Sequence, residues 1–149
     1  MEINGLPLHA LVVHAAVVLG PPAAPTGLLY ATVPRWRDWL RWPLAVLEAV
    51  ALASIWVAYL SGEQVAEANT YGGPLEPLLE EHEERAEVLR LSMTAFAIAS
   101  FAAAWWHART GVLRTVLSLL VGATAILTLA YVVLTGDAGA QIAWFGTHG

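Results

Sequence analysis

Four long apolar segments decide what this chain can fold into. They run from about Leu6 to Val33, Pro43 to Ser61, Leu89 to Trp106 and Val112 to Thr135. A helix needs about 20 apolar residues to cross the hydrocarbon core of a bilayer. The sequence therefore predicts an all-α fold, a polytopic membrane four-helix bundle, in which residues 1–149 form a single four-span transmembrane domain. Gly20-Pro21-Pro22 and Pro25 interrupt the first segment, so a kink or a looser second half is expected there.

The composition excludes several classes of protein. Hydrophobic residues make up 58% of the 149 residues and charged residues 13%, against about 25% charged in soluble globular chains. The net charge of -5 repels phosphate and argues against nucleic-acid binding. The absence of cysteine excludes disulfides, thiolate metal sites and cysteine-ligated iron–sulfur clusters. No phosphate loop, nucleophile elbow or paired-carboxylate signature is present, which leaves enzymatic activity open.

The arginines predict the orientation. Three lie in the connection 34–42 and two in the connection 107–114, whereas Arg85 and Arg90 on the opposite side are outnumbered by glutamates. Basic connections stay on the cytoplasmic side, so a multi-pass protein of a bacterial plasma membrane with both termini extracytoplasmic is expected. Tryptophans that mark the two interfaces agree with this orientation: Trp36, Trp39, Trp42, Trp105, Trp106 and Trp144.

The third helix is expected to begin near Pro77, outside the membrane. At 100° per residue one face collects His82, Ala86, Leu89, Met93, Phe96, Ser100 and His107, and the other collects Glu80, Glu83, Glu84, Glu87 and Arg90. The acidic run is therefore interpreted as the solvated face of an amphipathic helix and not as a calcium loop.

The chain also contains a weak internal repeat. Leu60-Ser61-Gly62-Glu63 closes the second span and Leu134-Thr135-Gly136-Asp137 closes the fourth. His9 precedes Leu60 by 51 residues, and His82 precedes Leu134 by 52. Two helical hairpins are predicted, each opening with a histidine and closing with a glycine turn, related by an axis along the membrane normal.

Histidines are the first candidate site residues. His9, His14 and His82 belong to the outer half, His107 to the inner end of the third helix, and His148 to a glycine-rich tail where it is expected to be idle. Neutral imidazoles from two helices can clamp a haem iron or another metal, which makes His9 and His82 the candidate metal ligands. The competing interpretation is that these residues are interfacial and bond to helix caps, to water or to each other.

Glu48 is the only carboxylate well inside a span. An ionised group there costs roughly 3 kcal/mol on insertion scales, so a partner is expected. His107 is one candidate for an intramembrane polar pair. Arg37, Arg41 or Arg114, reaching in from the interface, is an equally good alternative.

The opening segment from Gly5 to His14 resembles the Gly-His-Pro-x-His-Pro-x-Leu-Val opening of a family of bacterial membrane proteins, the domain of unknown function 2231 family. Ser61-Gly62, His82 and the stretch from Thr135 to Ala140 are similar to it as well. The resemblance implies a four-helix membrane domain, sometimes fused to Rieske-type iron–sulfur domains, and thus redox work. His9, His82 and His14 carry over. Leu6 replaces the first family histidine, and Asp137 stands where many relatives carry histidine, which puts a four-histidine site in doubt.

The leading hypothesis is a small electron-transfer subunit that binds b-type haem near the extracytoplasmic face. His9 and His82 are its expected ligands, His14 is a third candidate, and Arg85 is expected to pair with a propionate. The expected partners are the lipid bilayer and an extracytoplasmic iron–sulfur or other redox protein, and self-association is left open. The alternatives are a cofactor-free scaffold with structural histidines, and a metal-ion or proton pathway through Glu48 and His107.

Overall fold

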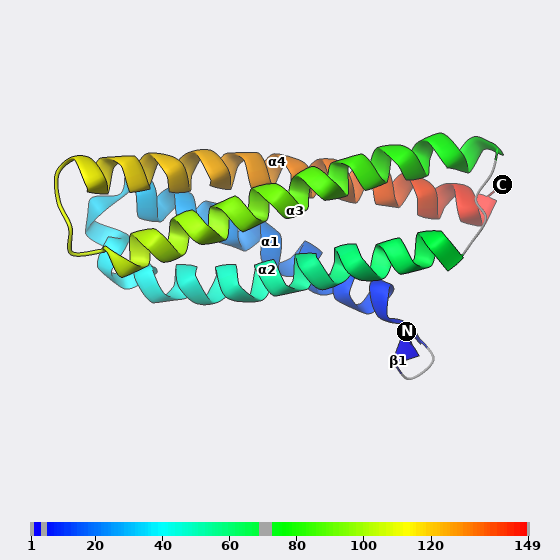
Figure 1. Cartoon of the computed structure of the whole chain (residues 1–149), viewed down its shortest axis with the longest axis horizontal. Helices are drawn as coiled ribbons and strands as arrows, with labels where there is room; N and C mark the ends of the chain where they lie inside the picture. The colour runs from blue at the N-terminus through cyan, green and yellow to red at the C-terminus, as the bar shows by residue number, and fades with distance from the viewer. Residues whose placement is uncertain (1, 4–5, 69–72, 149) are drawn as a thin grey trace.

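The structure, a computed structural model, describes residues 2–3, 6–68 and 73–148, without the side chains of residues 2–3, 6–11, 14, 15, 17, 19, 74 and 146–148. Its helices, shown in Figure 1, are α1 (Leu8–Thr32), α2 (Arg37–Ala68), α3 (Glu76–Trp105) and α4 (Val112–His148). Single 3-10 turns, Pro34–Trp36 and Gly73–Leu75, precede α2 and α3. The two-residue strands β1 (Glu2–Ile3) and β2 (Leu6–Pro7) pair antiparallel before α1.

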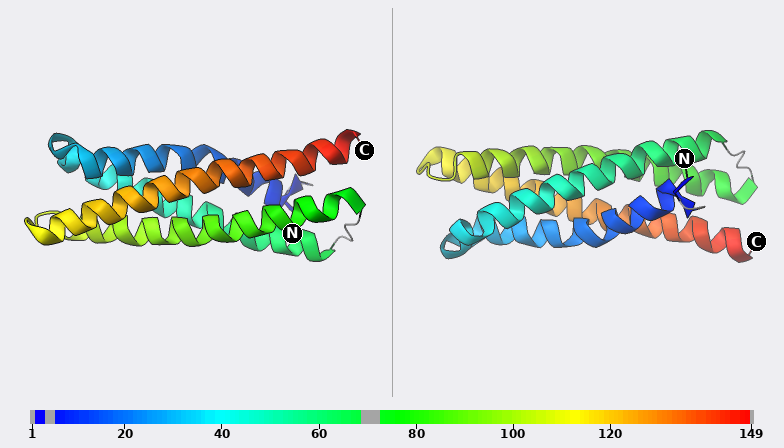
Figure 2. Two further views of the ribbon diagram at one scale, coloured as in Figure 1. Left: turned by 90° about the horizontal axis from the view of Figure 1, so that it is seen from above. Right: turned by 90° about the horizontal axis from the view of Figure 1, so that it is seen from below.

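The four helices form an up-down-up-down bundle. Helix α1 packs beside α2 and α4, and α3 packs beside the same two helices, so α1 and α3 occupy opposite corners. Figures 1 and 2 show both termini at one end of the bundle and the α3–α4 connection at the other. The predicted all-α four-helix bundle is confirmed, and its helices form two antiparallel hairpins. We call the end that holds residues 33–41 and 106–114 the arginine end, and the end that holds the termini the acidic end.

The chain is an integral membrane protein. Among the described residues, the helical segments Pro34–Ala68, Glu76–Trp105 and Val112–Phe145 are long and apolar enough to cross a bilayer. Large apolar side chains cover the outside of these helices, as a protein solvated by lipid requires; examples are Val46 on α2, Ile98 on α3, and Leu119, Ile126 and Val133 on α4. Helix α1, 25 residues without a charged side chain, completes the bundle, and its crossing of the membrane stays a prediction.

The inward face of α3 is the one that the sequence predicts. Leu89, Met93, Phe96 and Ser100 are buried, and His82 is half-buried on the same stripe. The glutamates of the opposite face are exposed, and α3 begins at Glu76, close to the expected Pro77. The acidic run is therefore one face of a long helix.

Proline and glycine do not interrupt the helices as expected. Helix α1 continues through Pro21, Pro22 and Pro25, and the kink or looser second half expected there stays a prediction. The predicted glycine turns after Ser61 and Thr135 are wrong, because α2 runs on to Ala68 and α4 to His148. Glycine in a helix interior costs only about 1 kcal/mol relative to alanine, so a single glycine does not by itself end a helix.

Close packing at Gly27 generates a test of the fold. A Cβ atom at Gly27 would lie 2.6 Å from Cζ of Phe96, which is fully buried. We expect Gly27→Ala to lower the free energy of unfolding by about 1–3 kcal/mol, the usual cost of overpacking. Gly122→Ala is the matched control, because its Cβ would meet only Ala31 Cβ at 3.9 Å. Thermal unfolding of the two variants in detergent should separate them, and equal midpoints would contradict this packing.

The orientation in the membrane has its own test. Because five arginines lie at the arginine end, we expect both termini on the extracytoplasmic side. A reporter fused to the C-terminus should be active only if it requires export. Activity of a reporter that works only in the cytoplasm would reverse the orientation.

Candidate functional site

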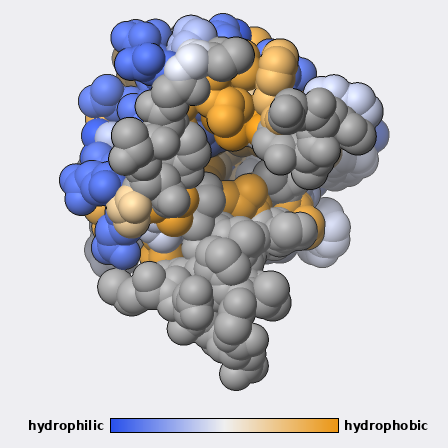
Figure 3. All heavy atoms as spheres, turned by 90° about the vertical axis from the view of Figure 1, so that its right-hand side faces the viewer, coloured by the Kyte–Doolittle hydropathy of each residue, from blue (hydrophilic) through white to orange (hydrophobic). Residues whose placement is uncertain are grey.

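A cavity of about 680 Å³ opens at the acidic end of the bundle. All four helices line it, mostly with small or apolar side chains, among them Val13, Ala16, Ile55, Leu89, Val132 and Ala140. Figure 3 looks onto this end and shows apolar atoms inside a hollow between the helices. The carboxylates of Glu63, Glu67 and Glu83 also line it and are themselves exposed to solvent. The cavity is therefore apolar within and acidic at its mouth.

His82 is the histidine that the structure places in this cavity. Its Nδ1 lies 3.1 Å from the carbonyl oxygen of Thr135 on α4. Since a carbonyl can only accept, Nδ1 carries the proton and donates it, and in the neutral ring Nε2 keeps the lone pair. Gly139 lets the ring approach α4, because a Cβ atom there would lie 3.2 Å from Cε1 of His82. The orientation of the imidazole is thus fixed by backbone.

Arg85 does not take the position expected for a propionate partner. Its Nη1 donates to the carbonyl oxygen of Leu134 at 3.1 Å, and its Nη2 is paired with the carboxylate of Glu81. Arg85 is not one of the described residues that line the cavity. Its Nη1 ties α3 to α4, and its Nη2 is held within α3.

The side chains of His9, His14 and His148 lie outside the described residues. The structure therefore leaves their predicted roles as they stand. The structure does show that Val13, one helical turn after His9 in α1, lines the cavity.

Glu48 is fully buried, with none of its surface exposed. It lies on the inward stripe of α2 with Leu44, Ala51 and Ile55. Neither carboxylate oxygen has a hydrogen-bond partner among the described residues. The predicted pair with His107 is not formed, and neither is a pair with Arg37 or Arg41.

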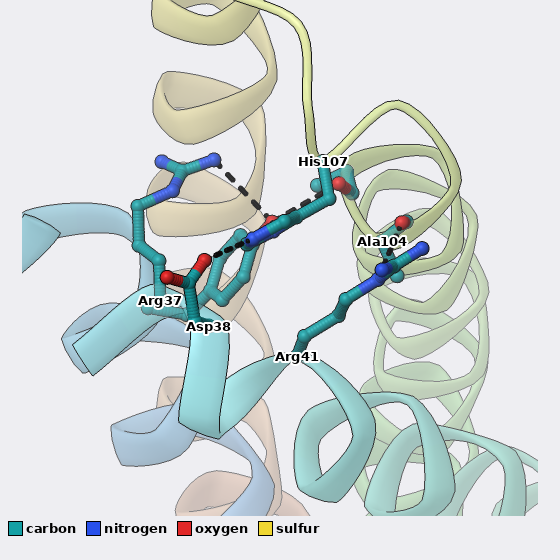
Figure 4. Close-up of polar contacts among 7 residues, drawn as sticks. Arg37, Asp38, Arg41, Ala104 and His107 are labelled. Carbon is teal, nitrogen blue, oxygen red and sulfur yellow. Dashed lines mark hydrogen bonds and ion pairs between the residues drawn. The ribbon is translucent and has the colours of Figure 1, made fainter. Parts of the chain in front are cut away.

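His107 belongs instead to a polar cluster at the arginine end, drawn in Figure 4. Its Nε2 lies 2.6 Å from Oδ1 of Asp38, and its Nδ1 lies 3.0 Å from the hydroxyl of Tyr30. Arg37 is buried and donates from Nη1 to Ser118 at 2.7 Å and from Nη2 to the Tyr30 hydroxyl at 3.3 Å. Arg41 donates from Nε to the carbonyl oxygen of Ala104 at 2.9 Å. These contacts occupy Arg37 and Arg41, two of the three arginines that were candidate partners of Glu48.

The Tyr30 hydroxyl joins three helices through its polar contacts. The Tyr30 hydroxyl donates to the carbonyl oxygen of Ala103 at 3.0 Å and accepts from Arg37. The two ring nitrogens of His107 contact the Tyr30 hydroxyl and the carboxylate of Asp38. The side chain of Asp38 is 97% exposed, so the chain of contacts runs from water to the buried hydroxyl.

Sequence reasoning missed Tyr30, Asp38 and Ser118 in this cluster. The available signals were a tyrosine inside an otherwise apolar span and one acidic residue among arginines. It placed Ser100 on the inward face of the third helix but gave it no role, and it missed Thr128. The hydroxyls of both are buried and have no hydrogen-bond partner among the described residues.

No cluster of three or more histidine, aspartate or glutamate side chains suited to a metal ion occurs in the part of the chain that the structure describes. Comparison of the chain with protein-family models, with curated proteins and with solved structures finds no match. The interpretation of the site therefore rests on its own geometry and on the short sequence motifs.

The Tyr30 cluster generates a test by removal of one oxygen. Tyr30→Phe leaves the Ala103 carbonyl, Nδ1 of His107 and one Arg37 donor without this partner. We expect a loss of about 1–3 kcal/mol in the free energy of unfolding, the cost of unsatisfied buried polar groups. Tyr131→Phe is the matched control, because the Tyr131 hydroxyl has no hydrogen bond to a described residue. Equal losses in the two variants, measured by thermal unfolding in detergent, would argue against the cluster.

Proposed function

We propose that this protein is a small membrane redox subunit that holds a b-type haem in the cavity at the acidic end. One observation carries the proposal: an oriented histidine, His82, stands in the wall of an apolar cavity open at one end. Haem supplies a one-electron couple when it is bound, and the protein supplies ligation, orientation and electrostatics.

The dimensions and the lining of the cavity suit a flat apolar ring. Sites for small ligands and cofactors occupy about 300–1,000 Å³ and are lined mainly by apolar side chains, and this cavity has about 680 Å³. Small residues such as Ala16, Ala86 and Gly139 line it from three helices. Such residues let a ring approach the helix backbones closely.

The hydrogen bond to Thr135 prepares His82 for ligation. Histidines that bind metals usually donate their other ring N–H to a carbonyl or carboxylate, which fixes the tautomer and orients the ring. His82 donates Nδ1–H to the Thr135 carbonyl oxygen, so Nε2 is the ligand nitrogen in this proposal. The sequence repeat makes His9 the second ligand, with His14 as its substitute.

Charge decides how the haem would be oriented. Its propionates are anionic, and Glu63, Glu67 and Glu83 at the mouth of the cavity repel them. Because these carboxylates are exposed, water and salt screen much of the repulsion. The propionates would therefore point into water and not toward Arg85. The acidic mouth weakens haem binding in this proposal, and its neutralisation should strengthen it.

The absorption spectrum of protein purified from haem-supplemented cells tests the proposal. We expect a low-spin bis-histidine spectrum that His82→Ala abolishes and His148→Ala preserves. Gly139→Ala should weaken haem binding, because its Cβ would displace the His82 ring. Gly122→Ala should have a much smaller effect, because Gly122 does not line the cavity and its Cβ would meet only Ala31 Cβ at 3.9 Å. A colourless wild-type protein would leave the cofactor-free scaffold in place of this proposal.

Removal of the negative charge at the mouth of the cavity distinguishes haem, whose propionates are anionic, from a cationic ligand. Glu63→Gln, Glu67→Gln and Glu83→Gln together should tighten haem binding in a titration of the apoprotein. Weaker binding after this change would contradict the proposed orientation of the propionates.

The proposed setting is a bacterial plasma membrane with the cavity on the extracytoplasmic side. A haem there would exchange electrons with an extracytoplasmic iron–sulfur or other redox protein. Two sequence features support this part of the proposal, namely the arginine distribution and the resemblance of residues 5–14 to a family whose domain is sometimes fused to Rieske-type domains.

A further inference from the structure

We propose that Glu48 is a proton-binding site in a path for protons through the bundle, from Asp38 at the arginine end to the cavity at the acidic end. The path goes beyond the haem proposal and does not depend on it. Its parts are the buried carboxyl, two buried hydroxyls, and a polar group exposed to water at each end.

Burial without a partner makes Glu48 a neutral carboxylic acid in this structure. Its side chain is inaccessible to water and its oxygens have no partner among the described residues. An isolated carboxylate in apolar surroundings neutralises, because retaining the charge costs more. A carboxylic acid that carries a proton is able to release it when a partner or water approaches. An ionisable residue inside a membrane bundle marks an ion or proton pathway by default.

Buried hydroxyls lie on both sides of Glu48 along the bundle. Ser100 on α3 and Thr128 on α4 are fully or almost fully buried, and their oxygens have no partner among the described residues. Ser100 is one turn from Ala104, which accepts a hydrogen bond from Arg41 at the arginine end. Thr128 is two turns from Thr135, which lines the cavity. Native proteins rarely leave buried polar atoms unpaired, so a row of them along one interior needs an explanation.

Each end of this row reaches water. At the arginine end the contacts run from the exposed Asp38 through His107 to Tyr30, which is fully buried. At the acidic end the cavity reaches inward as far as Ile55 and Val132. Ile55 is seven residues from Glu48, roughly 10 Å along the helix axis.

Protons cannot cross these gaps by side chains alone. Neighbouring polar groups along one helix are up to two turns apart, roughly 11 Å, which exceeds the reach of a hydrogen bond. Water must therefore enter between them for transfer, and the buried hydroxyls and Glu48 are the groups that would hold it.

Proton uptake by liposomes tests the proposal. Purified protein without added haem is reconstituted with an enclosed pH dye, and a potassium diffusion potential drives protons inward. We expect wild type to acidify the interior faster than empty liposomes do, and Glu48→Gln, which cannot release a proton, to fall to the rate of empty liposomes. Glu84→Gln is the matched control, because Glu84 is an exposed carboxylate on the outer part of α3.

Two results would overturn the proposal: wild-type uptake equal to that of empty liposomes, or Glu48→Gln uptake equal to that of wild type. Should Glu48→Gln fail to fold, Ser100→Ala and Thr128→Val carry the test. Both should slow proton uptake, and unchanged uptake in both would overturn the path.

Infrared spectroscopy provides a measurement that needs no transport. Wild type should show the C=O stretch of a neutral carboxylic acid in an apolar environment, and Glu48→Gln should lack it. Absence of this band in wild type would overturn the assignment. A colourless protein that conducts protons would refute the haem proposal alone, and a coloured protein that does not conduct would refute the path alone.

Discussion

Lipid hydrocarbon offers no hydrogen-bond partner, and this constraint decides where each side chain of the bundle lies. Ser92, Ser100 and Thr128 are buried, whereas Leu119 and Ile126 are largely exposed, the reverse of a bundle in water. Without a hydrophobic driving force between helices, close contact must hold them together. Gly27 against Phe96 is such a contact, and it leaves no room for a single added carbon. A second close contact, between the His82 ring and Gly139, shapes the cavity.

The sequence predicted the features that depend on local periodicity. The inward face of α3 follows from a repeat of 3.6 residues, which needs no knowledge of the other helices. The predicted turns after Ser61 and Thr135 were wrong, since α2 and α4 both continue past them. A glycine ends a helix only where no other interaction favours continuation of the helix. Here α4 continues past Gly136 and supplies both the Thr135 carbonyl and the space at Gly139 for His82. The position of the His82 ring therefore depends on residues of α4 that lie more than 50 positions later in the chain, and local periodicity does not reveal them.

The same distinction applies to the candidate site. His82, Glu48 and His107 stand out in the sequence because polar side chains are rare in apolar spans, and the structure places all three inside or at the ends of the bundle. The hydrogen-bond partners of His82 and His107 could not be predicted from the sequence. Asp38 and His107 are 69 residues apart and meet because the α1–α2 turn and the α3–α4 connection lie at one end. His107 was a candidate partner of Glu48, but Glu48 lies eleven residues after Arg37 on α2, roughly 16 Å along the helix from the arginine end.

Distance also limits how strongly the two proposed activities could affect each other. A cofactor in the cavity would lie no closer to Glu48 than about 10 Å, the two turns that separate Ile55 from Glu48. At an effective dielectric constant of about 20, one added electron on the cofactor would then favour the proton on Glu48 by no more than roughly 1.7 kcal/mol. Such a coupling would change the proton affinity of Glu48 by a factor of about 18 at most. The two proposals are therefore separable by experiment, because even a bound, reduced cofactor would bias the proton path without creating or abolishing it.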